Sequence, residues 1–242
     1  MNKYKSTFLF ATLFLLSLLF GCHPKNKDEV QDWFDKGAVG CDINGSLHQC
    51  SRWDYLTEIE FKDMVMLGVQ KMNPPIKHGD SIFDLGVGVG APFKVLGEFF
   101  SDLKVGGSDL AKNAIDVAIR VFPEYAENFL VHDMTKKHAI ADNSQDHVVS
   151  FGALGMYLTK KEMLKAFKEA LRMTKPGQSM LFTHFIEPGK SVRGSIITPV
   201  ERKFLLEELS NLGMENIEFH SLKSIKSQGK RFVITATKKK DI

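Results

Sequence analysis

Three alternating glycines between two acidic residues are the part of this chain best suited to chemistry. Gly86, Gly88 and Gly90 follow a short apolar segment, and glycines in such a turn let the backbone approach a ligand closely. Asp84 stands two residues before the first glycine, and Asp109 follows the last glycine by 19 residues. That interval is close to the roughly 20 residues that separate a glycine-rich turn from an acid that binds ribose hydroxyls. The spacing therefore predicts a nucleoside pocket.

The acid and glycine pattern Asp84-x-Gly86-x-Gly88-x-Gly90 resembles motif I of the class I S-adenosylmethionine-dependent methyltransferases. The resemblance extends in order over about residues 55–240, and its Pro-Gly turn at 176–177 is typical of the branch that methylates small molecules. It implies an S-adenosylmethionine cofactor and methyl transfer by in-line displacement to a nitrogen, oxygen or sulfur atom. Asp84 would orient the glycine loop and the amino-acid end of the cofactor.

The same resemblance implies further cofactor contacts. Asp109 and Leu110 match the ribose-binding position, Asp133 and Met134 match the position that contacts adenine, and Phe151 ends a strand close to the methyl group. A simpler interpretation stays open for Asp84 and Asp109, because Asp is also a common N-cap of a following helix. On that interpretation Asp84 and Asp109 would only begin helices.

Two other classes of function remain as alternatives. Gly86-x-Gly88-x-x-Ala91 also satisfies the looser glycine pattern of a nicotinamide or flavin site, and a glycine run alone is weak evidence. An NAD-dependent oxidoreductase would usually need more chain for a separate substrate region. The second alternative is an exported protein of the same fold that binds a ligand without catalysis.

A general base is harder to assign from the sequence. Many relatives carry two histidines where this chain has Gly155 and Met156, so the histidine pair of those relatives is absent here. The candidate catalytic residues are His184, at the end of the fifth predicted strand, and Tyr157, in the loop after the fourth. A base is needed only if the acceptor is protonated. The chain lacks the Asn/Asp-Pro-Pro-aromatic motif of nucleic-acid and protein amide methylases after the fourth strand, which favours a small-molecule acceptor.

The N-terminus predicts targeting to a membrane or to the secretory route. Lys3 and Lys5 precede an apolar run of 13 residues at 8–20, which suits the core of a signal peptide and is short for a membrane span. Gly21-Cys22 then resembles the end of a bacterial lipobox, so that Cys22 could carry a lipid anchor. The side of the membrane on which the rest of the chain lies stays open.

The segment after the anchor carries the other two cysteines. Cys41 and Cys50 could form a disulfide in an oxidising compartment or remain free thiols, and the sequence does not decide between them. Trp33, Trp53 and Tyr55 could form an aromatic lid over the site or simply pack a capping helix. No metal site is expected, since no second pair of ligands follows at zinc-finger spacing.

Composition limits the partners and the domain count. The formal net charge of +3 is small, and its lysines and arginines are scattered, so no nucleic-acid partner is expected. The sequence makes no prediction of oligomeric state. Its length suits one α/β domain. We expect a signal peptide or anchor at 1–22, a polar lead-in or cap at 23–53, and a methyltransferase domain at 54–242.

The elements that would position these residues alternate between strand and helix. Apolar runs predict strands at 81–85, 104–108, 128–132, 147–151, 179–185, 217–221 and 231–237, and apolar spacing predicts helices at 54–72, 92–100, 112–122, 160–173 and 200–212. Such alternation predicts a doubly wound, mostly parallel sheet with helices on both faces. The family resemblance implies seven strands, an antiparallel last strand and an N-terminal helical cap.

Overall fold

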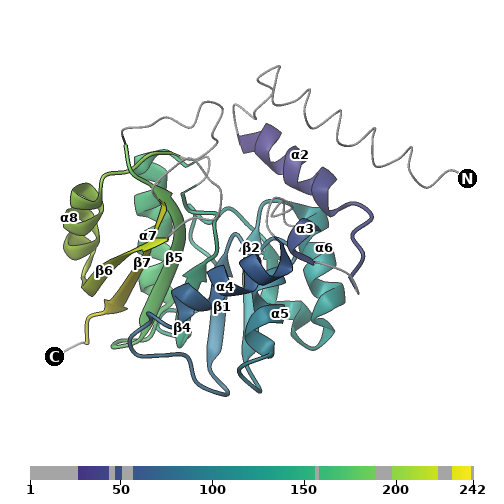
Figure 1. Cartoon of the computed structure of the whole chain (residues 1–242), viewed down its shortest axis with the longest axis horizontal. Coiled ribbons are helices and arrows are strands. Elements are labelled where there is room, and N and C mark those ends of the chain that lie inside the picture. The colour runs from purple at the N-terminus through teal and green to yellow at the C-terminus, as the bar shows by residue number, and fades with distance from the viewer. Residues whose placement is uncertain are drawn as a thin grey trace, which may run out of the picture.

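The computed structural model describes residues 27–43, 47–50, 57–155, 158–188, 198–222 and 231–240. Within them, seven strands form one sheet in the order β3-β2-β1-β4-β5-β7-β6 (Figure 1). The strands are β1 (Ser81–Leu85), β2 (Lys104–Asp109), β3 (Phe129–Val131), β4 (His147–Ser150), β5 (Ser179–Ile186), β6 (Met214–Leu222) and β7 (Arg231–Lys238). The first five are parallel, and β7 pairs antiparallel with both β5 and β6. The fold class predicted from the sequence is confirmed.

The central strands are apolar on both faces because helices cover both faces. Ile82 of β1 packs with Val149 of β4 and Leu181 of β5 in one buried cluster. Phe83 and Val148, their neighbours in the chain, pack in a second cluster on the other face. Since successive side chains of a strand point to opposite faces, this alternation requires two hydrophobic layers.

The helices divide between those two layers. They are α4 (Glu58–Val69), α5 (Ala91–Gly97) and α6 (Lys112–Val121) on one face, and α7 (Lys160–Met173) and α8 (Arg202–Leu212) on the other. Both α4 and α7 begin at a capping box, in which a threonine and a glutamate three residues later bond each other's backbone N–H groups. These bonds fix the start of α7 at the predicted residue.

Most predicted elements lie within a few residues of the observed ones. The largest differences are a short 3-10 helix, η1 (Pro123–Asn128), which was not predicted, and the start of α4, which lies four residues later than expected. The hairpin turn predicted around residues 227–229 lies outside the described residues.

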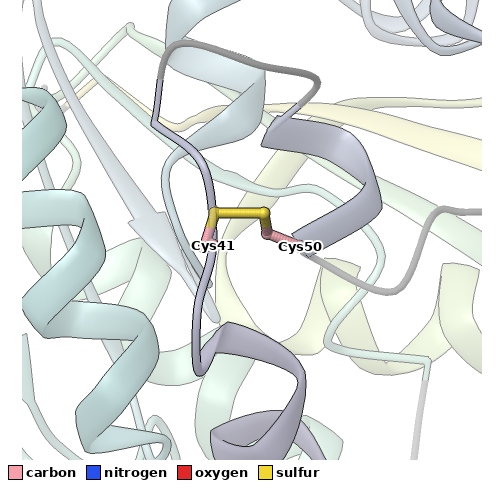
Figure 2. Close-up of a disulfide and its surroundings, with 2 residues drawn as sticks. All are labelled: Cys41 and Cys50. Carbon is pink, nitrogen blue, oxygen red and sulfur yellow. A yellow bond between two sulfur atoms is a disulfide. The ribbon is translucent and has the colours of Figure 1, made fainter. Parts of the chain in front are cut away.

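The segment before the sheet contains helices that the sequence did not locate. They are α2 (Lys27–Ala38) and α3 (Leu47–Cys50), and α2 lies beside α6 (Figure 1). Cys41 and Cys50 form a disulfide with a Cα–Cα distance of 5.7 Å (Figure 2). The structure thus answers the question of pairing that the sequence left open.

In the part of the chain that the structure describes, no helix is long and apolar enough to cross a membrane. The apolar run at 8–20 lies outside that part.

Candidate functional site

The glycine loop after β1 adopts a conformation that depends on glycine. Gly86, Gly88 and Gly90 have φ angles of 83°, 54° and 77°, a left-handed region that other residues rarely adopt. The backbone N–H groups of Gly86 and Val87 both donate to the carbonyl of Ser108, which continues the pairing of β1 with β2 into the loop. The loop is therefore held at the carboxyl edge of the sheet.

Two neighbouring loops press against the first glycine. A Cβ atom on Gly86 would lie 2.1 Å from the Cβ of Ala153, in the loop after β4, and 3.0 Å from the Cε of Met134, in the loop after β3. The contact with Ala153 leaves no room for a side chain at position 86. The loops that follow β1, β3 and β4 therefore meet at Gly86.

Asp84 is a buried carboxylate, and one of its two oxygens has no hydrogen-bond partner among the described residues. It lies in β1 with 1% of its surface exposed, and its Oδ1 accepts a 3.4 Å bond from the N–H of Phe151. Its Oδ2 is buried without a hydrogen-bond partner among the described residues. Burial raises the pKa of Asp84 well above its usual 3.8, the Phe151 bond lowers it, and the charge of Asp109 raises it further. Asp84 does not cap a helix, since the N-cap of α5 is Gly90 and no side chain caps that helix.

Asp109 links the glycine loop to the end of β2. Its Oδ2 accepts a 2.9 Å bond from the N–H of Gly88, and its Oδ1 accepts a 2.9 Å bond from the N–H of Ala111. Burial raises the pKa of Asp109, while those two bonds lower it. The N-cap of α6 is Ala111, so Asp109 does not cap that helix by its side chain. Each carboxylate oxygen retains lone-pair capacity for a further donor.

The remaining predicted cofactor residues surround the same edge. Asp133 accepts bonds from the backbone N–H and the hydroxyl of Thr135, which shapes the loop after β3. Leu110 follows β2 and is half-buried, and Phe151 follows β4 and is buried. The structure brings the predicted cofactor residues together at one edge of the sheet.

The two predicted catalytic residues stay predictions. His184 lies within β5, and Tyr157 lies outside the described residues.

This arrangement fits an adenosyl ligand that carries positive charge. The unpartnered oxygen of Asp84 offers a place for a cationic donor, and Asp109 offers lone pairs for two ribose hydroxyls. A dinucleotide would place its anionic pyrophosphate at the glycine loop, close to the buried carboxylate of Asp84. Like charges at close range are unfavourable, so Asp84 favours the cationic ligand.

Two histidines that were not predicted as site residues, the buried His138 and the half-buried His132, lie beside β2 and β3. The rings of His132 and His138 lie 4.1 Å apart, and the Nε2 of His138 is 2.8 Å from the hydroxyl of Ser108. Glu169 accepts a bond from the backbone N–H of His138, and Arg172 donates to Glu169 through two nitrogens. Burial, followed by the neighbouring His132, lowers the pKa of His138 to about 4.

We expect this histidine to make the fold sensitive to acid. Its folded-state pKa of about 4 lies below the usual 6.5, so the unfolded chain binds more protons between these values. The stability present above pH 6.5 is therefore lost as the pH falls toward 4. Wild type should lose about 2 kcal/mol more than His138→Gln between pH 7 and pH 5 in urea unfolding. His78→Gln, at an exposed histidine, should behave as wild type, and an equal loss in all three proteins would contradict the assignment.

Comparison with known proteins places the central part of the chain in one family. Residues 83–182 match the family model described as a methyltransferase domain. That span runs from β1 to β5 and includes the glycine loop and every predicted cofactor residue. The match favours the methyltransferase interpretation over the nicotinamide one.

Individual relatives agree with this match. A demethylmenaquinone methyltransferase from Paenarthrobacter aurescens is 29% identical over 168 residues, which cover 68% of this chain and 58% of that protein. A phosphoethanolamine N-methyltransferase from Haemonchus contortus, solved with S-adenosylmethionine, has a TM-score of 0.60 at 18% identity over 74% of this chain and 53% of its own. A possible exported protein from Bordetella parapertussis has a TM-score of 0.59 at 13% identity over 92% and 91% of the two chains. The chain thus spans little more than half the length of the first two.

Proposed function

We propose that this chain, which belongs to the class I S-adenosylmethionine-dependent methyltransferases, transfers the methyl group of that cofactor to a small-molecule acceptor. The observation that carries the proposal is the pair of acids around the glycine loop. Asp84 holds a buried, unpartnered carboxylate oxygen, and Asp109 holds the loop through Gly88 while it can still accept two hydroxyls.

The chain's own residues would bind and orient the cofactor. Asp84 would attract the cationic amino-acid end, Asp109 with Leu110 would bind the ribose, and Asp133 with Met134 would contact the adenine. When bound, the cofactor supplies an electrophilic methyl group on a sulfonium. The protein then has to align an acceptor atom in line with that methyl group and exclude water. Such positioning can contribute up to about 7–11 kcal/mol to a reaction barrier.

A small-molecule acceptor has support from the sequence and from the relatives' names. The chain has Ser150-Phe-Gly-Ala after β4 where amide methylases of nucleic acids and proteins carry a Pro-Pro motif. The two methyltransferases named above carry the names of small acceptors, a demethylmenaquinone and phosphoethanolamine. We propose an acceptor of that size with a nucleophilic nitrogen, oxygen or sulfur atom.

Incubation of the full-length protein with methyl-labelled cofactor and a panel of small amines, thiols, phenols and carboxylic acids tests the proposal. We expect label to move to one chemical class, and Asp109→Ala to abolish the transfer at low cofactor concentration. Cofactor binding without transfer to any member would instead support a ligand-binding protein without catalysis.

We also propose that the N-terminal segment attaches the protein to a membrane through Cys22. Its apolar run and the Gly21-Cys22 pair support this, and the Cys41–Cys50 disulfide accords with an oxidising compartment. Expressed in a bacterial host with labelled fatty acid, the wild type should carry label and sediment with membranes. Cys22→Ser should lose the label, whereas Cys41→Ser should keep it. Label that persists in Cys22→Ser would overturn the anchor.

A further inference from the structure

The segment before α4 contacts both helices that begin at the cofactor loops. We call residues 27–43 and 47–50 the cap. Within it, α2 packs on α6, which follows Asp109, and α3 packs on α5, which follows Gly90. The cap therefore touches the element after the ribose-binding acid and the element after the glycine loop.

The cap is anchored on the domain by two buried apolar residues. Ala38 at the end of α2 and Leu47 at the start of α3 are 2% and 3% exposed and belong to the cluster that contains α5 and α6. The Cys41–Cys50 disulfide joins the turn after α2 to the last residue of α3 (Figure 2). The covalent bond thus couples the part of the cap on α6 to the part on α5.

Asp35 makes the polar contact between the cap and the start of α6. Its Oδ1 accepts a 2.8 Å bond from the N–H of Asn113, and its carbonyl accepts a bond from the Asn113 side chain. Asn113 lies in the first turn of α6, where backbone N–H groups lack partners within the helix. The carboxylate of Asp35 also acts on Asp109, since its charge is among the causes that raise the pKa of Asp109.

We propose that the disulfide-closed cap clamps the two cofactor loops together, with Asp35 as a positioning residue that acts through α6 on Asp109. The proposal deepens the methyltransferase function and rests on it. The expected consequence is control of cofactor affinity by the redox state of the cap. In the switching step, a dithiol reductant gives two electrons and two protons, the Cys41–Cys50 bond breaks into two thiols, and the reductant becomes a disulfide.

The test measures ligand affinity of the full-length chain in detergent by calorimetry, before and after reduction with dithiothreitol. S-adenosylhomocysteine and 5′-methylthioadenosine are the probes, because the second keeps the adenosine but lacks the amino-acid end. We expect reduction to lower the affinity for both ligands by about tenfold, since the cap acts at the ribose side of the site. Unchanged affinity after complete reduction would overturn the cap proposal alone. If the oxidised wild type binds neither ligand, the proposed function fails and the cap proposal fails with it.

If reduction unfolds the protein, a variant that keeps the disulfide still tests the proposal. Asp35→Ala, with the disulfide intact, should weaken both ligands to a similar extent and speed hydrogen exchange at the amides of Gly88 and Ala111, which bond Asp109. Asp32→Ala is the matched control, because Asp32 lies one turn earlier on α2 and pairs with Lys36 on the surface. Equal affinity and exchange in the two variants would contradict a positioning role for Asp35.

Discussion

Asp109→Ala is expected to weaken binding of S-adenosylhomocysteine roughly 100-fold or more, because each hydrogen bond to a charged group contributes about 1.5–3 kcal/mol. The substitution removes the acceptor for the ribose hydroxyls. It also removes the bonds that hold the N–H groups of Gly88 and Ala111, so the glycine loop loses its tie to β2. Isothermal titration of wild type and variant measures the change directly.

The control for this substitution is another aspartate in the next helix. Asp116→Ala removes an exposed carboxylate of α6 that pairs with Lys112, and it should leave ligand affinity unchanged. 5′-Methylthioadenosine should lose as much affinity as S-adenosylhomocysteine in Asp109→Ala, since both carry the ribose. An affinity within about threefold of wild type, below the contribution of one such bond, would remove Asp109 from the site.

Asp84→Asn is expected to stabilise the ligand-free protein and to weaken binding of the cofactor. The pKa of Asp84 is higher in the folded protein than in the unfolded chain, so the free energy of unfolding falls as the pH rises above 3.8. The loss is complete once the buried carboxylate is ionised. The amide keeps the bond from Phe151 without a buried charge. We expect a gain of about 1 kcal/mol, or roughly 2–4 °C in Tm, at neutral pH.

The same substitution should change the affinity for one ligand and leave the affinity for the other unchanged. S-adenosylhomocysteine should bind about 10- to 100-fold more weakly, because its ammonium loses a charged partner. 5′-Methylthioadenosine has no such group and should bind as before. A variant that is less stable than wild type, or that loses both ligands equally, would show that Asp84 holds the fold together and does not receive the cation.

The local features of the fold were predictable because they depend on near neighbours in the chain. The strand before Gly86, the helix that begins after Thr159 and the acid at the end of β2 each follow from apolar period, capping residues or glycine spacing. Asp84 and Asp109 were predicted as site residues from their distance to the glycines. The burial of Asp84 and its bond from Phe151 could not be predicted, because both depend on β4 and the residue that follows it.

The features that sequence reasoning missed depend on contacts between distant segments. Asp35 and Asn113 are 78 residues apart, and nothing near Asp35 in the sequence indicates its partner. The contact of His138 with Ser108 spans 30 residues and was hidden for the same reason. The polar composition of 23–53 predicted a lead-in or cap but did not locate α2, which packs on α6.

The central claim is that the acids and the glycine loop form a pocket for an adenosyl cofactor. Titration of the full-length, disulfide-intact protein with S-adenosylhomocysteine, and separately with NAD, tests it most directly. We expect saturable binding of one S-adenosylhomocysteine per chain and no heat of binding with NAD. Absence of binding at saturating S-adenosylhomocysteine, or equal binding of NAD, would contradict the claim.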